Sequence, residues 1–379
     1  MKYLIGTLGI ILVISGWMAF RATSTSSGET RVKVLQIVES GTHEIADSYS
    51  APTQVLEVEI LSGPEKGSVA TFTNDYVMLK KGDRAFVAKV ETEEGARYVL
   101  TDPDRVPILA VLFISFILLV VFFGGLQGVR GLIALAGSFL LIGYLLLPGI
   151  LNGYPVLLVT IGVSALIIIL GSYITHGFNK TTTAAVIGMI GTVIFTGILS
   201  YIVVNMARFN GITSDEDFYL NNQFAGGIDL VGLLLGGMVI GLLGVLYDAA
   251  ISQAIAVEEL HQVAPHLDRK VIFSRAIRIG REHIGALVDT LAIAYVGVSL
   301  PLLLLFMATV DLPLYQILNQ QIFATEIIRI LIGSIGLVLA VPITTALSVW
   351  ILMKEREGEV SIETLEKEQE ALKHFHHHH

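Results

Sequence analysis

Two carboxylates lie inside or beside long apolar stretches of this sequence, where charge is unusual. Asp289 falls within the apolar run 284–306, about one and a half helical turns from its start, and Asp248 ends a glycine-rich apolar run. A carboxylate at membrane depth is costly unless it meets water or a partner, so such residues mark proton or ion pathways. Asp248 could be a solvated cap at the membrane boundary, whereas we expect Asp289 to face neighbouring helices.

Other polar residues are placed to join these acids. Ser252 and Glu259 follow Asp248 at helical spacing, which predicts that this helix continues out of the membrane. We expect Asp248 and Asp289 to share one polar cluster, because they flank one excursion of the chain. The candidates for proton, ion or polar-cluster chemistry are Asp248, Asp289, Ser252, Glu258, Arg281 and Thr290.

Arginines along the segment 248–283 form a second pattern. Arg275, Arg278 and Arg281 are each three residues apart, so a helix would place them on one stripe. The stripe could lie against anionic head groups or pair with the two acids. The segment's histidines, His261 and His266, are poorly spaced for a shared metal.

Glycines recur along the apolar run before Asp248. Their spacing puts small residues on one side of a helix and predicts close helix packing, either static or as a sliding interface. These residues are Gly232, Gly236, Gly237, Gly241 and Gly244.

Several polar residues lie near the ends of other apolar runs. Asp229 opens the glycine-rich run, where a helix's first turn favours an acid. Glu326 and Arg329, three residues apart, are expected to pair or to reach the membrane interface. Tyr201 and Asn205 could line a path, although interfacial tyrosines are also common as anchors.

Catalysis on a soluble substrate is not expected. The sequence has no phosphate-binding glycine loop, nucleophile elbow or zinc-binding helix motif, so we predict no enzyme activity, no cofactor and no metal. Cysteine is absent, and residues 376–379 resemble a purification tag.

The elements that must position these residues are membrane helices. Of 379 residues, 53% are hydrophobic and 15% are charged, and the mean hydropathy is +0.72. These values predict a polytopic α-helical membrane protein. With a first span at 4–20, we expect about eight spans, since about 20 apolar residues cross the bilayer. The later apolar runs are 107–124, 131–148, 155–174, 182–206, 228–247, 284–308 and 324–352.

Basic residues predict the orientation. Loops 174–181 and 248–283 and the tail from Lys354 carry lysine or arginine, whereas 149–154 and 309–323 carry none. The basic segments should be cytoplasmic, with both termini inside, as in a multi-pass protein of a bacterial cytoplasmic membrane. The net charge of −9 comes mainly from polar segments, and no basic surface for nucleic acid is evident.

We divide the chain into four parts. Residues 1–25 form an N-terminal anchor or a cleaved signal, and residues 106–353 form the transmembrane domain with its cytoplasmic segment 248–283. Residues 354–379 are a cytoplasmic tail and tag.

Between the anchor and the transmembrane domain, residues 31–105 alternate apolar and polar side chains, which predicts a small all-β domain outside the membrane. The segments 54–60, 67–73 and 82–90 suggest strands of a barrel of the oligonucleotide/oligosaccharide-binding (OB) type, although other folds fit.

The stretches GLLGVLYDAAISQAIAVEEL (241–260) and IGREHIGALVDTLAIAYVGVSLPLLLL (279–305) resemble the YibE/F family of bacterial multipass membrane proteins. The resemblance implies the single N-terminal span and the external domain but supplies no activity. That family often has Asn where this chain has Asp289, so a carboxylate there need not be obligatory. The matching positions are Asp248, Ser252, Glu258, Gly280, Arg281, Gly285, Thr290, Ala294, Tyr295 and Gly297.

Two functions are consistent with these features. The first is a transporter or ion-coupled membrane machine of unknown substrate. Protein-export and resistance-nodulation-division transporters offer a distant likeness to it. The second is a non-transporting scaffold or assembly factor whose external domain binds a protein partner. Besides such a protein, the partner we expect is the lipid bilayer.

Overall fold

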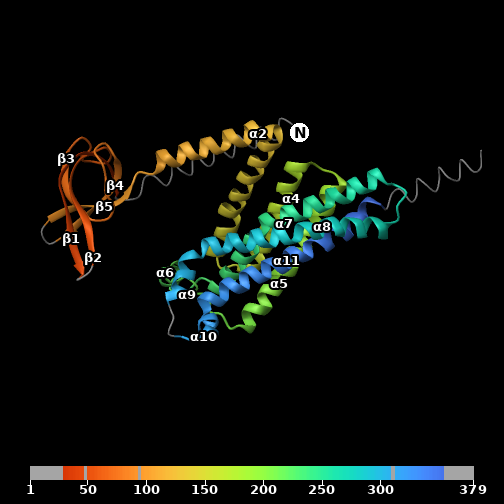
Figure 1. Ribbon diagram of the computed structural model, residues 1–379. Helices are drawn as coiled ribbons and strands as arrows, with labels where there is room; N and C mark the ends of the chain where they lie inside the picture. The colour runs from red at the N-terminus through yellow and green to blue at the C-terminus, as the bar shows by residue number, and fades with distance from the viewer. Residues whose placement is uncertain (1–28, 47–48, 93–94, 309–311, 354–379) are drawn as a thin grey trace, which may run out of the picture. The chain divides into compact units, whose positions relative to one another are not determined.

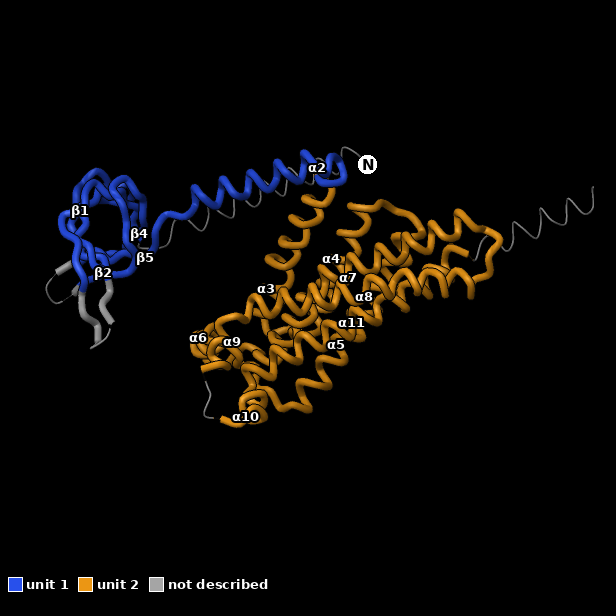
Figure 2. Tube along the Cα trace, viewed as in Figure 1, with its two compact units in different colours: residues 1–128 blue, residues 129–379 orange. Residues whose placement is uncertain are grey.

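The structure is a computed structural model that describes residues 29–46, 49–92, 95–308 and 312–353. It divides into two compact units, residues 1–128 and residues 129–379 (Figure 2). The predicted first span at 4–20 and the tail after residue 353 lie outside the described residues.

The first unit contains a curled antiparallel sheet (Figure 1). Its strand order is β3-β2-β1-β4-β5, and β3 also contacts β5. The predicted strands 54–60, 67–73 and 82–90 correspond to β2, β3 and β4. The strands are β1 (Glu29–Ala46), β2 (Tyr49–Ile60), β3 (Val69–Asn74), β4 (Arg84–Thr92) and β5 (Gly95–Pro103).

Alternation of side chains accounts for the sheet's core, because every second residue points to the concave face. Register shifts in β1 after Val34 and Ile37 bend that strand, which pairs with both β2 and β4. The buried core residues are Val32, Val34, Leu56, Val58, Ile60, Phe72, Leu79, Ala85, Val87 and Leu100.

Helices make up the rest of the described chain. They are α2 (Val106–Leu141), the π-helical turn η1 (Ile142–Leu146), α3 (Leu147–Leu151), α4 (Val156–His176), α5 (Lys180–Met206), α6 (Asp215–Gln223), α7 (Leu230–Val263), α8 (Arg269–Val298), α9 (Leu300–Ala308), α10 (Leu314–Asn319) and α11 (Gln321–Leu352).

Five helical stretches among the described residues are long and apolar enough to cross a membrane, and the bent pair α8 and α9 would make a sixth. One stretch, residues 106–151, combines two predicted spans. Its backbone leaves the helical conformation at Gly125, where φ is 54° and ψ is −139°. Glycine tolerates this left-handed φ because it has no Cβ.

The α8–α9 pair bends by 68° between Val298 and Leu300. Pro301 explains why α8 does not continue: it has no backbone N–H for the carbonyl four residues earlier, and its ring would clash with that carbonyl. The predicted span 284–308 is therefore a broken helix.

The centre of the second unit is formed by α5, α7 and α11, with α4 and α8 packed beside them. Small residues bring the antiparallel α5 and α11 together. A Cβ built on Gly188 would lie 2.5 Å from Thr344 Oγ1, and one on Gly336 would lie 2.3 Å from Thr196 Cγ2. Most of the buried polar side chains in this bundle are threonine and serine, as is common in membrane bundles.

The polar segment 207–227 contains the short helix α6. The Ser214 hydroxyl accepts from the Asp217 backbone N–H, and the Asp217 carboxylate accepts from the Ser214 N–H. This reciprocal cap satisfies helix donors and explains a helix in an acidic stretch.

Candidate functional site

Asp248 lies on the outer surface of the helical bundle. As predicted, α7 continues without interruption from its apolar half to Val263. Its exposed stripe carries small and polar residues at intervals of three, four or seven: Gly237, Gly241, Gly244, Asp248, Ser252 and Glu259. Among the described residues, Asp248 has no hydrogen bond or ion pair.

Asp289 is also exposed, contrary to the expectation that it faces neighbouring helices. The side of α8 that packs on the bundle is set by its buried residues Ile272, Ala276, Gly280 and Leu291. Asp289 precedes Leu291 by two residues, which rotates it by about 200° around the helix. None of the hydrogen bonds or ion pairs of the described residues joins Asp289 to Asp248.

The remaining predicted partners do not gather around these acids. Arg281 and Ser252 are exposed, and Glu258 is half-buried. The Thr290 hydroxyl donates to the Ala286 carbonyl of its own helix at 2.7 Å. Hydrogen bonds within the described chain thus give no evidence of the predicted polar cluster.

The glycines of α7 divide into two groups. Gly232 and Gly236 are buried against α4: a Cβ on Gly232 would lie 2.8 Å from Val156 Cβ, and one on Gly236 would lie 2.8 Å from Thr160 Oγ1. Gly237 and Gly244 meet no neighbouring atom within 4 Å of such a Cβ. Close packing therefore involves only part of this set.

Gly241 packs against Tyr295 of α8. A Cβ placed on it would lie 2.1 Å from the Tyr295 hydroxyl of α8. Gly241 is 11 residues into α7, about 16 Å along its axis, which is roughly half of the hydrocarbon thickness.

Tyr295 belongs to a polar cluster that joins the end of α8 to α11. Arg329 lies with its Cζ atom 5.9 Å from the Tyr295 ring centre and donates to Glu326 Oε1 at 2.6 Å. The Ser299 hydroxyl, at the α8–α9 break, donates to Glu326 Oε2 at 3.0 Å. The predicted pairing of Glu326 with Arg329 is present.

The cluster is partly shielded. The side chains of Glu326 and Arg329 are 19% and 23% exposed. Sequence reasoning considered these two residues only as a pair near the interface and missed Ser299. Pro301 two residues later was the available signal, because it predicts a helix break next to that hydroxyl.

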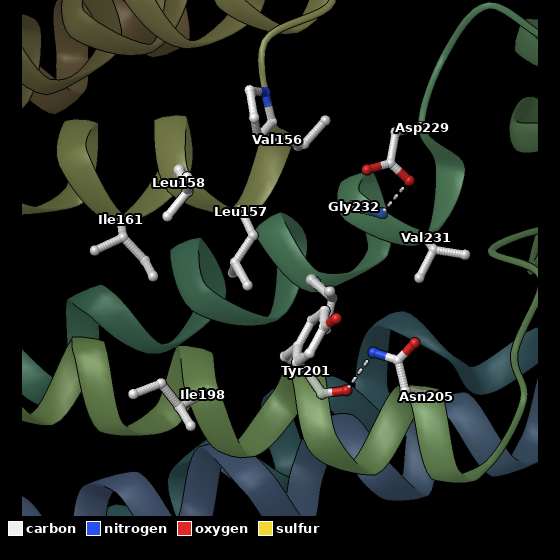
Figure 3. Close-up of a pocket in the computed structure, with 12 residues that line it drawn as sticks. Val156, Leu157, Leu158, Ile161, Ile198, Tyr201, Asn205, Asp229, Val231 and Gly232 are labelled. Carbon is white, nitrogen blue, oxygen red and sulfur yellow. Dashed lines mark hydrogen bonds between the residues drawn. The ribbon is translucent and has the colours of Figure 1, made fainter.

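A cavity of about 520 Å³ lies between α4, α5 and α7, at the end where α4 and α7 begin (Figure 3). Its walls are mainly aliphatic, and Tyr201, Asn205 and Asp229 provide the polar groups. Asp229 also caps α7, because its Oδ1 accepts from the Gly232 N–H at 2.8 Å.

The β domain has its own charged network. Glu65, in the β2–β3 connection, accepts from Lys89 Nζ of β4 at 2.5 Å and from the Tyr98 hydroxyl of β5. These hydrogen bonds lower the pKa of Glu65, with Lys89 the larger cause, and they raise the pKa values of Lys89 and Tyr98. These hydrogen bonds link the β2–β3 connection to β4 and β5.

The long apolar helices, packed into a bundle through small residues, define a multi-pass membrane protein. Residues 112–354 match the family model described as YibE/F-like protein, and the chain belongs to this family. No curated protein and no solved structure matches the chain.

Proposed function

We propose that this protein is an ion-coupled transport machine rather than an enzyme, and that Glu326 and Arg329 form its coupling site. One observation carries the proposal: an ion pair in an apolar helix is hydrogen-bonded to the break between α8 and α9. Ionisable residues inside membrane spans are expensive and commonly serve ion or proton movement. Broken helices are also common at transporter sites.

The geometry suggests how coupling would work. Ionised Glu326 accepts from both Arg329 and Ser299, so its charge connects α11 to the bend. A proton on Glu326 would remove its attraction for Arg329 and leave that guanidinium without its anion. The hydrogen bond between Glu326 and Ser299 would then transmit this change to α9, which begins at the next residue.

A pH titration of α9 tests the proposal. A fluorophore on Leu304→Cys reports on α9, because Leu304 is 68% exposed and the chain has no other cysteine. We expect the fluorescence to depend on pH and Glu326→Gln to abolish this dependence, since Gln keeps the shape but cannot ionise. Asp215→Asn, at an exposed acid of α6, is the control. An unchanged titration in Glu326→Gln would refute the coupling role.

The proposed topology has eight spans, both termini in the cytoplasm and the β domain outside a bacterial cytoplasmic membrane. It is supported by the Gly125 break, which would divide residues 106–151 into two spans. It also counts the α8–α9 pair and the predicted span at 4–20. The basic residues of the 248–283 segment support the orientation.

For the β domain we propose an OB-type barrel that binds a protein partner. The strand order β3-β2-β1-β4-β5, with β3 in contact with β5, supports a five-stranded barrel of this type. A pull-down with the full chain and with a chain lacking residues 31–105 tests the partner role. Equal recovery of bound proteins would exclude it.

A second candidate is the membrane scaffold. It is favoured by the exposed positions of Asp248 and Asp289, since carboxylates on a membrane-facing surface need a covering partner. Asp248→Asn and Asp289→Asn should then weaken assembly, measured as complex size on native gels, without changing the α9 titration. Full function of both variants in a deletion strain would remove the roles proposed for these acids.

A further inference from the structure

We infer that the cavity between α4, α5 and α7 binds one acyl chain of a membrane lipid whose headgroup carries an ammonium. Its volume of about 520 Å³ is within the range of small-molecule sites, roughly 300–1,000 Å³. The inference does not depend on the proposed coupling site.

The apolar lining of the cavity is suited to a lipid acyl chain. Leu157 and Ile161 of α4 form one aliphatic wall (Figure 3). Leu235 of α7 contributes another. Leu158 and Ile198 also line the cavity, and these side chains are 68% and 54% exposed. The cavity therefore opens on the bundle's surface, where the hydrocarbon of a bilayer meets α4 and α5.

The polar groups lie at one end of the cavity, as a lipid requires. Asp229 precedes the first residue of α7, and Asn205 is in the last turn of α5, so both are at the level where the helices end. The Asn205 amide donates to the Tyr201 carbonyl at 2.7 Å. A chain entering beside Leu235 would leave its headgroup near these residues.

The carboxylate of Asp229 selects an ammonium. Its Oδ1 accepts from the Gly232 N–H, and among the described residues no hydrogen bond uses Oδ2. Asp229 is the one charged residue among those lining the cavity. A headgroup cation complements it, whereas an anionic headgroup without an ammonium would be repelled.

Native mass spectrometry of the full chain, released from detergent and titrated with lipids of identical acyl chains, tests this site. We expect phosphatidylethanolamine to bind in preference to phosphatidylglycerol by about two- to five-fold, as for an exposed charge pair. Asp229→Asn should remove the preference while keeping the helix cap, because Asn caps as well as Asp.

Ile198→Trp should obstruct the cavity and reduce specific binding of both lipids to the background level. Ile187→Trp is the matched control: it lies 11 residues earlier on α5, is 46% exposed and does not line the cavity. Thermal unfolding should show that all variants remain folded.

Three results would overturn the inference. Equal binding of the two lipids by the wild-type chain would exclude ammonium selection. Unchanged binding in Ile198→Trp would place the lipid elsewhere. Absence of any specific lipid binding to the wild-type chain would exclude the site.

Discussion

Substitution of Gly188 by alanine should weaken the packing of α5 against α11. Gly188 lies on α5 against Thr344 of α11. The matched control is Gly191→Ala, three residues later on the same helix, because a Cβ there would meet no atom within 4 Å.

The magnitude follows from the contact distances. The added Cβ would lie 2.5 Å from Thr344 Oγ1 and 3.2 Å from Thr344 Cα, where ordinary contacts are 3.4–4 Å. Because Cα belongs to the backbone, a side-chain rotation alone cannot remove the overlap. Overpacking of this kind costs about 1–3 kcal/mol, offset by about 0.5–1 kcal/mol for alanine's better helix propensity. The expected net loss is about 1–2 kcal/mol.

Thermal unfolding in detergent provides the assay. A loss of about 1–2 kcal/mol should lower Tm by roughly 2–8 °C, whereas Gly191→Ala should leave Tm unchanged or raise it slightly. Thr344→Ala should partly restore Tm in the Gly188→Ala background, since it removes Oγ1 but not the backbone contact. Equal Tm values for the Gly188 and Gly191 variants would refute this account of the packing.

Three further predictions concern the β domain and the topology. Asp104→Ala should destabilise the β domain by about 2 kcal/mol, because the buried carboxylate accepts from Arg31 Nε at 3.0 Å; faster hydrogen exchange in β1 would show it. The lowered pKa of Glu65 means that its contribution to stability is complete above its ordinary pKa of 4.5 and is lost as pH falls through the lower folded value. Protection of the β2–β3 connection should therefore decrease below about pH 4.5, and Glu65→Gln should remove that dependence. A cysteine at Glu65 should react with an external reagent and one at Glu259 should not; the reverse pattern would invert the topology.

Local patterns in the sequence determined the kinds of elements and much of their extent. Alternation over 54–60 predicted a strand, and β2 contains that range. The apolar run ending at Asp248, followed by polar residues at helical spacing, predicted that α7 continues beyond the apolar region. These inferences succeed because side-chain periodicity and apolar length depend on residues close together in the chain.

The tertiary structure decided which face of each helix meets a neighbour. A helix that is apolar around most of its circumference carries little information about its packed side. The sequence therefore predicted that Asp289 faces the bundle, whereas the buried residues of α8 show that Asp289 lies on the opposite, exposed side. Glu326 and Ser299 meet although 27 residues separate them, because Pro301 ends α8 beside α11. The cavity near Asp229 likewise requires three helices. Such contacts depend on how the apolar surfaces of different helices fit together. Hydropathy measures how apolar a segment is, but it does not say which side of the helix meets a neighbour.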